Sequence, residues 1–141
     1  MSRSLGIDLG AKRVGLALSD SLNMIASPLK TLTFSNKKHL LKQLKIVITE
    51  FDIKTIVLGL PLSMSGIDSS QTKKIRDFKS SLSIFNLPII FEDERLSSIS
   101  AKKSMVMQNV KTGYNKSEID MRAAAIILQQ YLDKINIWKP F

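Results

Sequence analysis

Near its start the chain reads Gly6-Ile7-Asp8-Leu9-Gly10-Ala11-Lys12-Arg13-Val14-Gly15, and this stretch decides the fold. Period-two alternation predicts two strands, over residues 4–10 and 13–19, joined by a tight turn into a hairpin. The alternation places Asp8 on the face opposite the apolar side chains, between two glycines that have no side chain. An Asp that only caps a turn is the alternative, but Asp8 lies inside an apolar strand, where Asp is disfavoured. The space beside this carboxylate therefore suits a hydrated cation or a phosphate backbone.

The rest of the chain predicts a single α/β domain over residues 1–141. After the hairpin we expect an irregular or edge strand within residues 24–34, a helix capped by Asn36 and a buried parallel strand over residues 55–60. Then follow a helix that turns Ile75, Phe78, Leu82 and Phe85 inward, a buried strand over residues 87–91, a helix from Ser97 or Ser98 to about Val110, and a helix from Glu118 to about Lys134. This order predicts a mixed central β-sheet with helices on both faces.

The composition favours a polyanionic partner. The chain has 21 Lys and Arg against 12 Asp and Glu, a formal net charge of +9. A basic but otherwise inert surface is the alternative. Most of the excess is lysine, which contacts phosphates as a point charge, so nucleic acid would be recognised by its backbone and shape. The chain has no cysteine, which excludes disulfides and thiolate metal sites. With no signal-peptide pattern and no apolar run near the ~18 residues of a membrane span, we expect a cytoplasmic protein without membrane contact.

A second acidic group, Glu92-Asp93-Glu94, directly follows the strand predicted over residues 87–91. Ligands of open α/β sheets bind beyond the carboxyl ends of the strands. The alternative is a solvated strand end whose acids pair with lysines. Parity places Glu92 and Glu94 on one face and Asp93 on the other, and the local sequence does not choose among the three.

The third acid, Asp120, has two interpretations. The pattern Ser117-x-x-Asp120 resembles a capping box, which would make Asp120 a helix-start residue. Helical spacing also places Asp120 on the apolar stripe that should face the sheet, where an isolated carboxylate is costly and needs a partner. The stripe comprises Ala124, Ile127, Leu128 and Tyr131. Capping and metal binding are compatible.

Carboxylates at three places, with neither cysteine nor clustered histidine, predict Mg²⁺ or Mn²⁺ rather than zinc. The lone His39 lies among lysines on the expected solvated face of a helix and is assigned no role, so a Ser-His-Asp or Cys-His mechanism is excluded. Hard cations in a basic protein suit phosphodiester hydrolysis. Two ions about 3.5–4 Å apart would activate water and stabilise the leaving oxygen.

Four segments resemble the YqgF family, also called RuvX, in family order across nearly the whole chain. They are residues Gly6 to Gly15, Gly59-Leu60-Pro61-Leu62, Asp93-Glu94-Arg95-Leu96-Ser97 and the helix from Asp120 to Leu132. The resemblance implies an RNase H-like fold related to the RuvC resolvases, and a nuclease that processes the 5′ end of pre-16S rRNA. It also implies that Asp8, Glu94 and Asp120 form a catalytic, metal-binding triad, and that Lys12 and Arg13 contact phosphate. The loop after Leu62 has one glycine, Gly66, where the family often has a second, so no contact is transferred from that loop.

The leading hypothesis is a metal-dependent endonuclease that acts on structured RNA in ribosome maturation, with Arg95 beside Lys12 and Arg13 at the phosphate. Ribosomal assembly intermediates are further expected partners, and a monomer is expected rather than a dimer. One alternative cleaves four-way DNA junctions, which requires a dimer. Another is a non-catalytic RNA-binding assembly factor. The pattern Gly6-x-Asp8-x-Gly10 also resembles a phosphate loop of actin-like ATPases, but those need two such domains.

Overall fold

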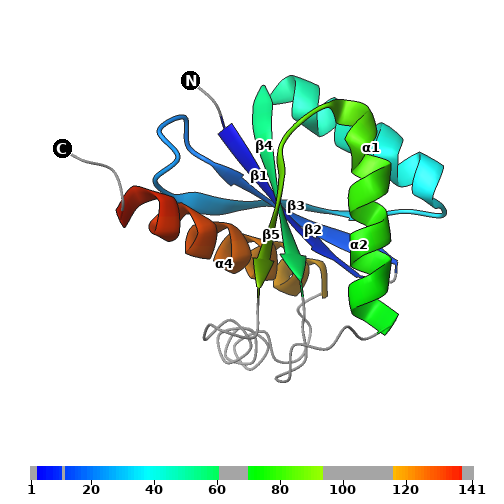
Figure 1. The fold of residues 1–141 in the computed structure, drawn as a ribbon. Coiled ribbons are helices and arrows are strands. Elements are labelled where there is room, and N and C mark those ends of the chain that lie inside the picture. Colours follow the sequence, from blue (N-terminus) through cyan, green and yellow to red (C-terminus); the bar gives the residue numbers. More distant parts are fainter. Residues whose placement is uncertain (1–2, 11, 61–69, 94–115, 138–141) are drawn as a thin grey trace.

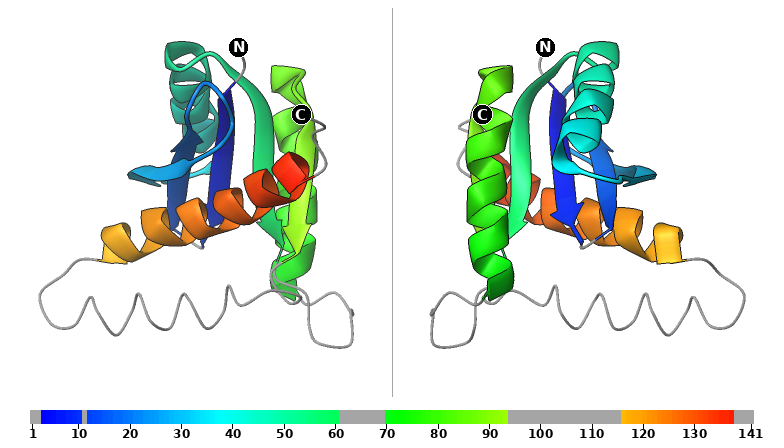
Figure 2. Two further views of the ribbon diagram at one scale, coloured as in Figure 1. Left: turned by 90° about the vertical axis from the view of Figure 1, so that its left-hand side faces the viewer. Right: turned by 90° about the vertical axis from the view of Figure 1, so that its right-hand side faces the viewer.

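The computed structural model describes residues 3–10, 12–60, 70–93 and 116–137, and these form a five-stranded sheet with helices on both faces (Figures 1 and 2). The strands, in chain order, are β1 (Arg3–Leu9), β2 (Arg13–Ser19), β3 (Ala26–Thr33), β4 (Ile53–Leu60) and β5 (Ile89–Asp93). The helices are α1 (Lys37–Glu50), α2 (Ser70–Leu82), the short 3-10 helix η1 (Ser83–Phe85) and α4 (Lys116–Ile137). None of these helices is long and apolar enough to cross a membrane.

The strand order β3-β2-β1-β4-β5 makes the sheet mixed, as the sequence predicts. β1 pairs antiparallel with β2, and β2 with β3, because short turns join them. β4 lies parallel to β1, and β5 parallel to β4, because α1 and α2 provide the long crossovers that parallel strands require. Both crossover helices cover one face, and α4 runs across the other (Figure 2).

The α1/α2 face holds the main apolar core. α1 begins where predicted, because the Asn36 side chain accepts a hydrogen bond of 2.8 Å from the backbone N–H of His39. Its apolar stripe then packs with that of α2 on large aliphatic side chains of the sheet. The fully buried residues here include Leu5, Ile7, Leu16, Leu40, Leu44, Ile56, Leu58 and Leu82.

The α4 face is lined by small residues instead. A Cβ added to Gly6 would lie 2.8 Å from Leu128 Cβ, and one added to Gly15 would lie 2.0 Å from the carbonyl oxygen of Asp120. Neither separation is tolerable, so only glycine allows the helix to approach this closely. The small-residue face inferred from the hairpin sequence is therefore the seat of α4.

Three boundaries differ from the sequence prediction. β5 begins at Ile89 and extends to Asp93, so Glu92 and Asp93 lie inside a half-buried edge strand rather than beyond a buried one. α4 begins at Lys116, so Ser117 lies within the helix rather than before it, and the capping-box interpretation does not hold. β3 is an edge strand, as predicted, and its register on β2 shifts beside Pro28. The helix predicted from residue 97 or 98 to 110 lies outside the described residues.

Candidate functional site

Asp8 and Asp120 come together around Gly15. Asp8 is half-buried at the carboxyl end of β1 and is the direct cross-strand partner of Gly15 in β2. Directly opposed residues of an antiparallel pair project from the same face, so Asp8 faces α4 together with Gly15. The Asp120 carbonyl of α4 lies on that same glycine. Two of the three acids predicted from sequence thus share one corner of the α4 face.

Asp120 forms an ion pair with Arg13. The Nε atom of Arg13 donates to Asp120 Oδ2 at 2.8 Å, and 38% of the arginine side chain and 25% of the aspartate side chain remain exposed. An acid on the buried stripe of α4 therefore has the partner that its position requires. Because the pair is partly exposed, it contributes at most about 1 kcal/mol to stability. Its main effect is to fix the first turns of α4 to the start of β2.

A cavity of about 260 Å³ opens at this corner, lined by Gly10, Lys12, Arg13 and Asp120. Lys12 is exposed, and Arg13 reaches the same space from the beginning of β2. Two cations thus lie beside the carboxylates, an arrangement suited to holding a phosphodiester against acidic groups.

Glu92 has a different role from Asp8 and Asp120. It projects from the α4 face, opposite Gly59 in the register, and is only 2% exposed. Its Oε2 atom accepts hydrogen bonds from Gln130 Nε2 and, at 2.5 Å, from Lys134 Nζ. This carboxylate therefore anchors the C-terminal half of α4. Sequence reasoning missed both partners, although their i,i+4 spacing on one helix face was a signal that they act together.

Asp93 and Glu94 separate by strand parity. Asp93 pairs with Leu60, which belongs to the core of the α1/α2 face. Glu94 and Arg95 lie outside the described residues. Within the described part of the chain, no group of three His, Cys, Asp or Glu side chains is placed to hold a metal ion.

Two residues set aside in the sequence have ordinary structural positions. His39 is exposed on α1, with its ring 2.9 Å from the side-chain amide of Gln43. Asp20 accepts hydrogen bonds from the backbone N–H groups of Met24 and Ile25, at 2.7 and 3.1 Å, and so shapes the turn before β3. These bonds to the ionised carboxylate lower the pKa of Asp20.

Comparison with solved structures defines the class of fold. T. thermophilus RuvC in complex with a Holliday junction substrate superposes with a TM-score of 0.60 at 14% identity, with all of both chains covered. The fowlpox virus Holliday junction resolvase gives a TM-score of 0.56 at 13% identity over 94% of this chain and 99% of that chain. The chain has the RuvC-like RNase H fold predicted from its sequence.

The sequence comparisons identify the family within that class. The profile of RuvX, described as "Holliday junction resolvase", matches residues 2–134. A "Putative pre-16S rRNA nuclease" of Gloeothece citriformis is 41% identical over 132 residues, which are 93% of this chain and 87% of the relative. The chain therefore belongs to the RuvX family, which confirms the resemblance noted in its motifs.

Proposed function

We propose that this chain, as one nuclease domain over residues 1–141, is a divalent-metal-dependent endonuclease that processes the 5′ end of pre-16S rRNA in the cytoplasm. The observation that carries the proposal is the meeting of Asp8 and Asp120 at Gly15, beside Lys12 and Arg13. Its membership of RuvX supports the nuclease activity, and the names of its relatives support the RNA substrate.

The donor set fits a hard cation. Asp8 and Asp120, together with Glu94, would hold two Mg²⁺ or Mn²⁺ ions, because carboxylate oxygens are the ligands these ions prefer. Gly15 leaves the sheet surface beside Asp8 without a side chain, and Arg13 bonds one oxygen of Asp120, Oδ2. When bound, such ions supply Lewis-acid activation of water and stabilise charge on the leaving oxygen.

The basic residues would orient the substrate. Lys12 is exposed at the mouth of the cavity and would hold a backbone phosphate as a point charge. Arg13 has five N–H donors, of which Nε bonds Asp120. Its terminal nitrogens would contact the phosphate while Nε keeps the carboxylate in place, and Arg95 would add a third positive charge.

The test is cleavage of a labelled pre-16S rRNA fragment with Mg²⁺ or Mn²⁺. We expect Asp8→Asn to lower the rate by more than about a hundredfold, because an amide cannot replace a charged metal ligand. Asp52→Asn is the matched control. Asp52 is exposed at φ 52°, a conformation that Asn adopts readily, so its rate should stay within about twofold. Equal rates for wild type and Asp8→Asn would refute the site assignment.

A second candidate function is cleavage of four-way DNA junctions, favoured by the family description and by the fold shared with RuvC. Symmetric cleavage of a junction needs two active sites and hence a dimer. We expect a monomer, and a junction tested beside the RNA fragment, with the mass of the protein measured in solution, separates the two functions. RNA binding without cleavage in either metal would favour a non-catalytic assembly factor instead.

A further inference from the structure

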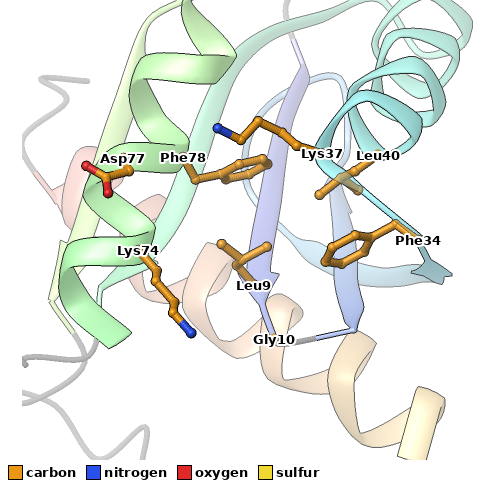
Figure 3. Close-up of a pocket in the computed structure, with 8 residues that line it drawn as sticks. All are labelled: Leu9, Gly10, Phe34, Lys37, Leu40, Lys74, Asp77 and Phe78. Atoms are coloured by element: carbon orange, nitrogen blue, oxygen red, sulfur yellow. The ribbon is translucent and has the colours of Figure 1, made fainter. Parts of the chain in front are cut away.

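A second concave site lies on the opposite face of the sheet, where α1 and α2 approach the carboxyl end of β1. This α1–α2 cavity has a volume of about 370 Å³. Its lining residues, drawn in Figure 3, are Leu9, Gly10, Phe34, Lys37, Leu40, Lys74, Asp77 and Phe78. The volume is within the range of small-molecule sites, about 300–1,000 Å³.

The α1–α2 cavity has an apolar floor and a charged rim. Leu9 and Phe34 are half-buried and form the accessible part of the floor, with nearly buried side chains beneath them. Lys37 and Lys74 are exposed and approach the space from opposite walls, α1 and α2 (Figure 3). Asp77, also exposed, adds one hydrogen-bond acceptor to the α2 wall. A flat, largely apolar ring attached to phosphates matches this arrangement.

Gly10 connects the α1–α2 cavity to the candidate catalytic corner. It lines the α1–α2 cavity, the cavity with Lys12, Arg13 and Asp120, and a third space of about 380 Å³. The third space also shares Leu9 and Lys74 with the α1–α2 cavity. Three hollows therefore surround the carboxyl end of β1, the end at which α/β sheets bind ligands. A strand held at one hollow can extend into the next.

We propose that the α1–α2 cavity binds one unstacked nucleoside of the substrate strand, adjacent to the phosphodiester held at Asp8 and Asp120. Its base lies on Leu9 and Phe34, and Lys37 and Lys74 contact the flanking phosphates. Proteins recognise single-stranded RNA by placing splayed bases on aromatic side chains while cations follow the backbone. This inference rests on the proposed function, because it takes the occupant to be part of the cleaved strand.

The test measures RNA binding in EDTA, so that no cleavage is required. A fluorescent pre-16S rRNA fragment is prepared as a series in which each member lacks one base at a successive position. For the wild type we expect one position near the cleavage site at which base removal weakens binding roughly tenfold. In Phe34→Ala, removal of the same base should change binding by less than about twofold, because the base then has no ring to contact.

The lysines provide a matched pair of variants. Lys74→Gln removes a cation of the α1–α2 cavity, whereas Lys73→Gln removes its exposed neighbour on the same helix, which does not line the cavity. We expect Lys74→Gln to weaken binding of the intact fragment about three- to fivefold and Lys73→Gln by less than about 1.5-fold. Both lysines are exposed, so this pair decides the question if Phe34→Ala does not fold.

The results separate this inference from the proposed function. Base-sensitive binding that depends on Phe34, with no cleavage in any metal, would keep the cavity assignment and remove the nuclease. Cleavage without any base-sensitive position, or base sensitivity that persists in Phe34→Ala, would overturn the cavity assignment. Equal effects of Lys73→Gln and Lys74→Gln, or no binding of the fragment at all, would overturn it as well.

Discussion

The two faces of the sheet are built by opposite means. The α1/α2 face is filled by side-chain volume, with leucines and isoleucines of the strands fully buried under two helices. On the α4 face, glycines of β1 and β2 allow the helix backbone itself to approach the sheet, and polar contacts fix its position. Arg13 bonds Asp120 near the start of α4, and Glu92 bonds Lys134 near its end. One face supplies most of the stability, and the other determines where an acidic side chain lies.

The α4 face is also fixed to the turn before β3. Gln129 accepts from the N–H of Ala26 at 2.8 Å and donates to the carbonyl of Met24 at 3.0 Å. Asn136 donates to the carbonyl of Asn23 at 2.8 Å. These directional bonds define one position of the helix along the sheet, which apolar packing on small residues alone would leave less well determined.

The largest effect on stability should follow Leu58→Ala, on the α1/α2 face. Leu58 is fully buried, so truncation removes apolar contact and leaves a cavity, at a cost of about 3 kcal/mol in the free energy of unfolding. Chemical denaturation measures this cost. The cleavage rate per folded molecule should remain near that of the wild type, and a large loss of rate would show that the two faces are not separable in function.

Gly15→Ala tests the α4 face. The added methyl would overlap backbone atoms of Asp120, which cannot rotate away, so α4 must shift. We expect about 2 kcal/mod of destabilisation. Unlike Leu58→Ala, this variant should also lose cleavage activity in the folded state, because Asp120 moves with the helix. Full activity in folded Gly15→Ala would contradict the role assigned to this close approach.

Lys134→Met tests the far end of α4. It leaves the buried carboxylate of Glu92 with Gln130 as its remaining side-chain partner among the described residues, and we expect a loss of about 1–2 kcal/mol. The double variant Lys134→Met with Glu92→Gln should recover part of this loss, because it removes the buried charge. Denaturation of both single variants and the double variant gives the coupling. Additive effects would show that the pair contributes no coupling energy.

The smallest effect concerns Asp20, whose turn receives the end of α4. Its pKa is lowered from 3.8 by the N–H groups of Met24 and Ile25, so its contribution to stability is present above that value and is lost as the pH falls through the lower folded pKa. Thermal melts of wild type and Asp20→Asn should differ slightly near neutral pH and converge in acid. A difference that grows on acidification would have the wrong sign.

The sequence by itself determined the features that depend on neighbours in the chain. The hairpin, the helix start at Asn36, the parallel strand that became β4 and the small-residue face around Asp8 all follow from local periodicity, capping and turn chemistry. Their physical causes act over a few residues, so the pattern of amino acids was enough to predict them. The family motifs added the order of the acidic positions and the class of fold.

Only the tertiary structure decided how the acids are used. Arg13 and Asp120 are 107 positions apart, and the partners of Glu92 lie 38 and 42 positions away on α4. The extent of β5 was likewise set by its pairing with β4, which brings Glu92 opposite Gly59. Local sequence made the acids beside β5 look alike. Packing of α4 on the sheet committed Glu92 to an anchor and placed Asp120 beside Asp8, because a helix seated on glycines has one position that satisfies both of its ends.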